Sequence, residues 1–382
     1  MSAPESTRQV GVKVYSTDWY LAHGMDYEEA ADRLVDQGFT FVIAQNRYLP
    51  MADSAVKSEV TPEQAERYRE YDDRAFVRAL QSRGLRYFAA CNMFFDTATL
   101  AEHPDALPID AQGRPAEMID WYLGVSPTHE GYLRAKLDQI TEAARQLQPD
   151  GLFLGFTRFP GFWELWLPND RRADFPEYCY SDRSIAAFEA HTGLRVPEGD
   201  TPIRAAWIRR EAYAAFVAWK GDVVRDVVAR ARSAVQAERP DAAIMLNTLP
   251  FRRDDFERAG LEVFAQDWRK LAEVVDIFEL MTYHQILARD TSWIRSVVED
   301  FKATVSNEAY CTLQADPLYL DGMHAARSRS TTLDATEFER AVAEVGASPA
   351  DGVVVFTWSD FLRKAESGDM RRIDALRRYR GR

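Results

Sequence analysis

The chain has 382 residues, enough for one large barrel with insertions or for two smaller domains. Hydrophobic residues make up 46% of it and charged residues 28%, so a proper core can form and the composition is not that of a disordered chain. The net charge of −13 argues against nucleic acid or an anionic membrane as the main partner, and it suits a neutral or cationic ligand.

Short apolar runs rich in β-branched residues alternate along the chain with amphipathic stretches, which is typical of βα units and a parallel sheet. The strands are predicted at Val10–Ser16, Thr40–Gln45, Arg86–Asn92, Gly151–Phe156, Ala242–Asn247, Ile277–Tyr283, Ala309–Gln314 and Gly352–Trp358. The helices are predicted at Tyr27–Gln37, Pro62–Arg83, His129–Leu147, Ser181–His191, Ala205–Ala237, Val263–Val274, Trp293–Ala303, Thr336–Glu344 and Met370–Tyr379.

Eight strands in order, each followed by a helix, favour a closed (β/α)₈ TIM barrel over the alternative of a doubly wound open sheet. No linker rich in Gly, Ser or Pro divides the chain. Residues 1–382 are therefore expected to form a single TIM-barrel catalytic domain, with a helical insertion after strand 4 at about 159–240. An active site would lie among the loops at the C-terminal ends of the strands.

Neither a targeting segment nor a membrane span is expected. Residues 1–8 are polar, and no window approaches about 18 uncharged apolar residues. The cysteines, Cys91, Cys179 and Cys311, are far apart and form no CxxC pair. Reduced thiols in a cytoplasmic protein are the simplest interpretation.

Polar residues indicate which side of each strand faces the barrel interior, because a charge facing the helix layer would be costly. On the sixth strand, Glu279 is expected to point inward, with Tyr283 on the same side. Glu279 could alternatively be a buried ion-pair partner of Lys13 inside the barrel.

The predicted C-terminal ends of the strands collect carboxylates and amides, and tryptophans lie in or beside the same loops. The carboxylates are Asp18, Asp96, Glu164, Glu279, Asp316 and Asp360. The expected substrate-binding residues are Asn46, Arg47, Asn92, Arg158, Trp163, Asn247, Tyr283, His284, Gln314 and Trp358. Amides and carboxylates hydrogen-bond hydroxyl groups and aromatic faces stack on sugar rings, so this set indicates a carbohydrate ligand.

Several of these residues also have a purely structural interpretation. Asp18 and Asp96 could be helix caps or turn residues, and His284 could hydrogen-bond only the backbone. Trp163 and Trp166 could pack the insertion onto the barrel instead of meeting a ligand.

The segment Asp150-Gly-Leu-Phe-Leu-Gly-Phe-Thr-Arg-Phe-Pro160 resembles the fourth strand of glycoside-hydrolase-like TIM barrels, which reads Asp-Gly-Ile-x-x-Asp-x-x-Arg-[Tyr/Phe]-Pro. Three further stretches, 121–127, 178–193 and 281–284, are similar to other parts of these proteins. The resemblance covers about half of the chain and implies a barrel that hydrolyses glycosidic bonds. It also implies that Arg158 contacts the ligand or orders a loop.

The sequence departs from this family at two points. The fourth-strand aspartate of the family is Gly155 here, so this chain cannot use the same residue if that aspartate is the nucleophile. Only Cys179 remains of the Cys-x-Cys-x-x-Cys pattern in the insertion, which argues against a zinc site there.

Glycoside hydrolysis needs one carboxylic acid to protonate the leaving oxygen and one carboxylate to act as base or nucleophile. The candidates are Glu279, Asp18, Glu164 and Asp360. Glu279 is the favoured acid, because a deep position in the barrel would keep a carboxyl protonated, and Asp18 or Asp360 is the favoured base. Glu164 could serve either role. With Gly155 in place of the family's aspartate, we favour an inverting mechanism.

Two other functions remain open at this point. One is a non-catalytic carbohydrate-binding barrel, and the other is a metal-dependent barrel hydrolase or lyase. The histidines are scattered and form no HxH or HExxH pair, and there is neither a P-loop nor a GxGxxG after a strand, so neither a metal nor a cofactor is expected. The sequence leaves open whether the chain forms a homo-oligomer.

Overall fold

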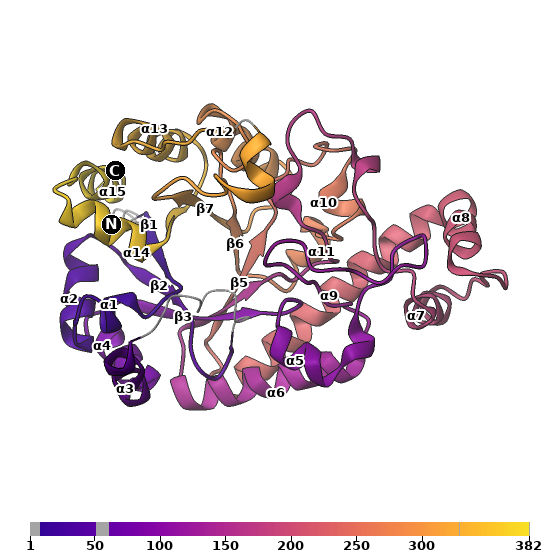
Figure 1. Cartoon of the computed structure of the whole chain (residues 1–382), viewed down its shortest axis with the longest axis horizontal. Coiled ribbons are helices and arrows are strands. Elements are labelled where there is room, and N and C mark those ends of the chain that lie inside the picture. The colour runs from indigo at the N-terminus through magenta and orange to yellow at the C-terminus, as the bar shows by residue number, and fades with distance from the viewer. Residues whose placement is uncertain (1–7, 51–60, 328, 382) are drawn as a thin grey trace, which may run out of the picture.

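The computed structural model describes residues 8–50, 61–327 and 329–381, and its eight parallel strands form one closed barrel in sequence order (Figure 1). The strands are β1 (Gln9–Val14), β2 (Phe41–Ala44), β3 (Arg86–Asn92), β4 (Gly151–Gly155), β5 (Ala243–Thr248), β6 (Ile277–Leu280), β7 (Glu308–Gln314) and β8 (Gly352–Phe356). Parallel pairing of β8 with β1 closes the barrel. The predicted (β/α)₈ TIM barrel is therefore confirmed, and the open-sheet alternative is wrong.

Helices surround this barrel. They are α1 (Asp18–Leu21), α2 (Tyr27–Asp36), α3 (Pro62–Glu70), α4 (Asp73–Ser82), α5 (Thr97–Glu102), α6 (Glu130–Leu147), α7 (Asp182–Thr192), α8 (Thr201–Glu211), α9 (Tyr213–Glu238), α10 (Ala259–Glu262), α11 (Trp268–Leu271), α12 (Ser292–Lys302), α13 (Ala335–Ala347), α14 (Trp358–Glu366) and α15 (Arg371–Arg380). Neighbouring helices of the layer pack on one another, as α6 does on α9 and α13 on α15.

Three predicted helices differ from the structure. The helix expected over 62–83 is divided into α3 and α4, because the Asp72 side chain accepts a hydrogen bond from the Arg74 backbone N–H and starts a new helix. The long helix expected over 205–237 is divided at Ala212 into α8 and α9. Of the helix expected over 263–274, only the short α11 forms, and Asp267 caps it.

Large rings fill the barrel interior, and glycines on neighbouring strands make room for them. Gly11 pairs with Phe41 and Gly151 pairs with Phe88 across adjacent strands. A Cβ atom on either glycine would overlap the ring of its partner. This pairing of large with small residues packs the interior tightly below the polar C-terminal ends of the strands.

The segment between β4 and β5 carries α7, α8 and α9. Figure 1 shows α7 and α8 standing apart from the barrel at one end of the long α9. Their core contains Phe188, Phe216 and Trp219, whose rings pack against one another. This small separate core holds the insertion together beside the loop that follows β4.

The expectation of no signal peptide rests on residues 1–8, of which 1–7 lie outside the described residues. Within the part of the chain that the structure describes, no helix is long and apolar enough to cross a membrane.

Candidate active site

A buried ion pair lies inside the barrel near its C-terminal end. Lys13 on β1 approaches Glu279 on β6, with 2.9 Å between Lys13 Nζ and Glu279 Oε1. The Asn247 side-chain amide, from the paired position on β5, donates a hydrogen bond to Glu279 Oε2. The Lys13 ammonium also lies 3.4 Å from the Tyr283 hydroxyl. Glu279 and Tyr283 thus both face the interior, and Glu279 is the partner of Lys13.

Burial and charge act in opposite directions on Lys13. Burial lowers the pKa of its ammonium, whereas the Glu279 carboxylate and its hydrogen bond raise it. The ammonium also lies 4.9 Å from the centre of the Phe153 ring, on the β4 side of the barrel. The Glu279 carboxyl therefore lies deep in the barrel beside the Lys13 side chain and the Asn247 amide.

A second carboxyl, that of Glu164, lies in the loop after β4. Glu164 belongs to a single 3₁₀ turn, Trp163–Leu165, and is 3% exposed. Its Oε2 atom is buried and has no hydrogen-bond partner among the described residues. Burial raises the pKa of this carboxyl to about 7, and the nearby positive charge of Arg158 only partly offsets the effect. Glu164 can therefore hold a proton near neutral pH.

The stacked rings of Trp163 and Tyr283 join the loop that carries Glu164 to the ion pair inside the barrel. The ring of Trp163, which precedes Glu164, stacks on the ring of Tyr283 with 6.1 Å between centres. Burial raises the pKa of the Tyr283 hydroxyl well above its usual value, and the charges of Glu279 and Glu164 both add to the increase. Tyr283 is therefore within electrostatic reach of both carboxyl groups.

Partly exposed aromatic rings lie around this site. Trp121 and Phe156 contact each other on the β4 side, with 6.0 Å between their ring centres. Tyr15 and Phe356, at the ends of β1 and β8, are 5.9 Å apart, and Phe356 is 5.4 Å from Tyr283. Such rings provide the stacking surfaces that the C–H faces of sugars use.

Gly155, at the position of the family's aspartate, lies at the end of β4 next to Asn92 of β3. A Cβ atom at Gly155 would lie only 2.7 Å from Asn92 Oδ1. Asn92 is buried, and its Nδ2 atom has no hydrogen-bond partner among the described residues. The Asn92 side chain thus occupies space that a side chain at position 155 would need.

This contact makes a stability prediction. Gly155→Ala should lower the free energy of unfolding by about 1–3 kcal/mol, because Asn92 must move to admit the methyl group. In a background carrying Asn92→Ala, the same change should cost less than half as much. Urea unfolding of the two single variants and the double variant measures this, and strictly additive costs would show that the two side chains do not compete for space.

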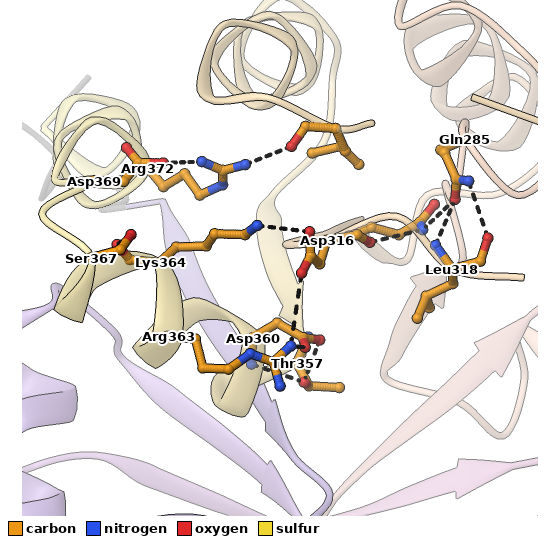
Figure 2. A network of polar contacts seen from close by, with 12 residues as sticks. Gln285, Asp316, Leu318, Thr357, Asp360, Arg363, Lys364, Ser367, Asp369 and Arg372 are labelled. Carbon is orange, nitrogen blue, oxygen red and sulfur yellow. Dashed lines mark hydrogen bonds and ion pairs between the residues drawn. The ribbon is translucent and has the colours of Figure 1, made fainter. Parts of the chain in front are cut away.

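Asp360 and Asp18, the two residues that the sequence favours as the base, lie in surroundings that differ from those of Glu164 and Glu279. The Asp360 side chain accepts a hydrogen bond from the Thr357 hydroxyl at 2.7 Å and forms a capping box at the start of α14. Figure 2 shows Asp360 beside Arg363, which also approaches Asp316 at 3.7 Å. Asp18 is exposed in the first turn of α1. These contacts give no basis for using either aspartate as the base.

Several expected ligand residues make structural contacts. The His284 ring lies 2.9 Å from Glu337 of α13, in the helix layer. The Trp358 indole donates to Gln37 at 2.9 Å, and the Asp96 side chain caps α5 and pairs with Lys136 at 2.9 Å.

Two further residues of the expected set, Asn46 and Arg47, lie in the loop after β2, and a third, Gln314, is the last residue of β7. The Asn46 side chain accepts hydrogen bonds from the backbone of its own turn. Arg47 stacks over Tyr68, and Gln314 donates to Gln285 at 2.9 Å. None of these contacts reaches Glu164 or Glu279.

Other residues of the site have no signal in the local sequence. The Arg329 side chain donates to the backbone carbonyl of Glu164. The hydroxyl of Tyr319 and the carboxylate of Asp120 are close enough to affect the charges of the cluster. Tyr319 and Arg329 come from the loop after β7, more than 150 residues from Glu164, and only the closed barrel brings them there.

Among the described residues, no group of three or more His, Cys, Asp or Glu side chains is arranged to hold a metal ion.

Several solved structures with a similar fold are glycoside hydrolases. The glycoside hydrolase domain of PgaB (BpsB) from Bordetella bronchiseptica matches with a TM-score of 0.65 and 14% identity, over 97% of this chain and 98% of that chain. A β-galactosidase from Marinomonas ef1 matches with a TM-score of 0.63 and 13% identity, over 92% of this chain and 54% of that chain. An endo-β-1,4-mannanase from Thermotoga petrophila matches with a TM-score of 0.51 and 10% identity, over 93% of this chain and 68% of that chain.

These matches show that the chain shares the TIM-barrel fold of glycoside hydrolase domains, which confirms the expected resemblance at the level of the fold. The chain spans about half of the β-galactosidase. A scan against models of known families and a search of curated proteins both find no match.

Proposed function

We propose that this chain is a glycoside hydrolase in which Glu164 is the general acid and Glu279 is the partner carboxyl group that acts as the base. The observation that carries the proposal is the buried Glu164 carboxyl, which has an unpaired oxygen and a pKa raised to about 7. A proton held at neutral pH on an otherwise uncommitted oxygen is what the leaving oxygen of a glycoside requires.

We assign the second role to Glu279, because its side chain lies 2.9 Å from the Lys13 ammonium and accepts a hydrogen bond from Asn247. Of the two carboxyl groups, Glu164 has the raised pKa that suits an acid, and Glu279 is left to act as the base. This reverses the role that the sequence suggested for Glu279, and it assigns Glu164 to one of the two roles left open for it.

We propose inversion as the stereochemical course. Gly155 places no carboxylate at the position of the family's aspartate, so we assign to Glu279 the activation of a water that attacks the anomeric carbon and whose proton it accepts. The test is proton NMR of the first-formed product. A product whose anomeric configuration is opposite to that of the substrate supports inversion, and the same configuration contradicts it.

A pH dependence follows from the assignment of the acid. The folded pKa of Glu164 is raised from 4.5 to about 7, so the protonated, active form is lost as the pH rises through about 7. We expect kcat/KM to fall about tenfold per pH unit above that point. Initial rates between pH 5 and 9 measure it, and a limb that falls near pH 4.5 would exclude Glu164 as the acid.

The activity itself needs a substrate screen. We expect the purified protein to cleave at least one member of a panel of chromogenic glycosides and reducing-end-labelled oligosaccharides, and Glu164→Gln to fail on the same member. A Glu164→Gln sample prepared in parallel shows whether any observed activity comes from a contaminating hydrolase.

A non-catalytic carbohydrate-binding barrel is the second candidate. It is favoured by Gly155 at the position of the family's aspartate and by the complete burial of Glu279 in its pair with Lys13. Calorimetric binding of an oligosaccharide that is never cleaved, even after prolonged incubation, would support this candidate over hydrolysis.

A further inference from the structure

Arg158, in the loop after β4, differs from the other buried arginines of the described chain. The buried arginines are Arg158, Arg329 and Arg372. Arg329 donates to the backbone carbonyls of Ile286 and Glu164, and Arg372 donates to Asp369 and to the carbonyl of Leu333. Arg158 is 2% exposed, yet its guanidinium makes no hydrogen bond or ion pair among the described residues, and its Nε atom is fully buried.

A buried guanidinium without an acceptor is costly, because its N–H donors have left water without gaining a partner. The structure also leaves its charge poorly balanced. Glu164 is the carboxyl whose charge acts on Arg158, and burial keeps Glu164 partly protonated near neutral pH. Asp120 is 3.1 Å from His324, which gives that carboxylate another partner. Arg158 thus lacks a committed counterion.

The Phe156 ring covers one face of the Arg158 guanidinium, and the N–H groups along the edge of the guanidinium have no acceptor among the described residues. The guanidinium carbon lies 4.9 Å from the centre of the Phe156 ring, a partly exposed ring of the site. The N–H donors of the guanidinium lie in its plane, so an acceptor that binds them approaches along this edge. A carboxylate is planar and matches that edge with two parallel hydrogen bonds.

We propose that Arg158 binds the carboxylate of a uronic acid residue, so that the substrate is an acidic glycan cleaved beside Glu164. This inference rests on the proposed function for the cleavage but not for the binding. The overall charge of −13 repels such an anionic substrate at long range, so recognition has to come from the short-range contact at Arg158.

The kinetic test uses pairs of substrates that differ only at C6: p-nitrophenyl glucuronides against glucosides and galacturonides against galactosides, in both anomers. We expect the wild type to prefer the uronide of one pair by roughly 10- to 100-fold in kcat/KM. Arg158→Met should abolish that preference. Arg158→Lys keeps the positive charge but cannot make two parallel hydrogen bonds, so it should retain part of the preference. Circular dichroism checks that each variant is folded.

Arg114→Met is the matched control. Arg114 lies in the loop between β3 and α6 and its side chain is 71% exposed, so this variant removes one positive charge from outside the site. It should leave the preference unchanged. Equal losses on uronide and neutral substrate in Arg158→Met, with a shifted pH limb, would show that Arg158 only positions Glu164 and would overturn the inference.

A binding measurement separates this inference from the proposed function. Calorimetry with free glucuronate and galacturonate, against glucose and galactose, should show binding of one uronate that Arg158→Met loses. Uronate binding without hydrolysis of any glycoside would support the inference and contradict the proposed function. Hydrolysis of neutral glycosides without uronate binding or preference would overturn the inference and leave the proposed function standing.

Discussion

Replacing Glu164 with glutamine should lower kcat for glycoside hydrolysis by about 10²- to 10⁴-fold, the usual contribution of a positioned general acid. Glutamine has the same shape but cannot give up a proton at neutral pH. Because Oε2 of Glu164 has no hydrogen-bond partner among the described residues, the amide removes no contact there. Steady-state kinetics on the best substrate measure the effect.

Stability separates a catalytic from a structural loss in this variant. The folded pKa of Glu164 is raised, so its contribution to stability is fully present below pH 4.5 and is lost as the pH rises to about 7. Relative to the wild type, Glu164→Gln should therefore become more stable over that window. Glu117→Gln, in the exposed loop between β3 and α6, is the matched control. Activity of Glu164→Gln within about threefold of the wild type would contradict the assignment.

Replacing Glu279 with glutamine should lower the free energy of unfolding by about 3–5 kcal/mol, because it leaves the Lys13 ammonium buried without its counter-charge. The combined variant Lys13→Met with Glu279→Gln should recover most of that loss, since it removes both charges together. Denaturant unfolding of the two single variants and the double variant gives the coupling energy.

The Asp96–Lys136 pair is a matched control for this cycle. It is equally buried, with 2.9 Å between Nζ and Oδ2, but it joins α5 and α6 in the helix layer. Asp96→Asn should destabilise the fold without changing kcat of the folded protein, whereas Glu279→Gln should reduce both. A coupling energy below about 0.5 kcal/mol between Lys13 and Glu279 would show that the two charges do not depend on each other.

The barrel was predictable because each strand is a short apolar run with turn residues around it, and this pattern is local. The inward direction of Glu279 followed from the same alternation. The capping box of Thr357 and Asp360 is also a local signal, Thr-x-x-Asp, and it identifies Asp360 as a helix-start residue without any structure.

The environment of Glu164 was not predictable from its neighbours in sequence. Its position in an aromatic loop was visible, but two of its neighbours, Tyr319 and Arg329, come from the loop after β7. Likewise, the helix break at Asp72 depends on a cap that competes with a favourable helical pattern on both sides. The surroundings of such residues depend on contacts with distant parts of the chain, which local sequence patterns do not predict.

The most direct test of Glu164 as general acid compares two leaving groups on the same sugar. A dinitrophenyl glycoside departs without protonation, whereas a phenyl glycoside needs the acid. Measured as kcat/KM, Glu164→Gln should retain most of the wild-type rate on the dinitrophenyl glycoside and lose about 10²-fold or more on the phenyl glycoside. Equal losses on both substrates would contradict proton donation by Glu164.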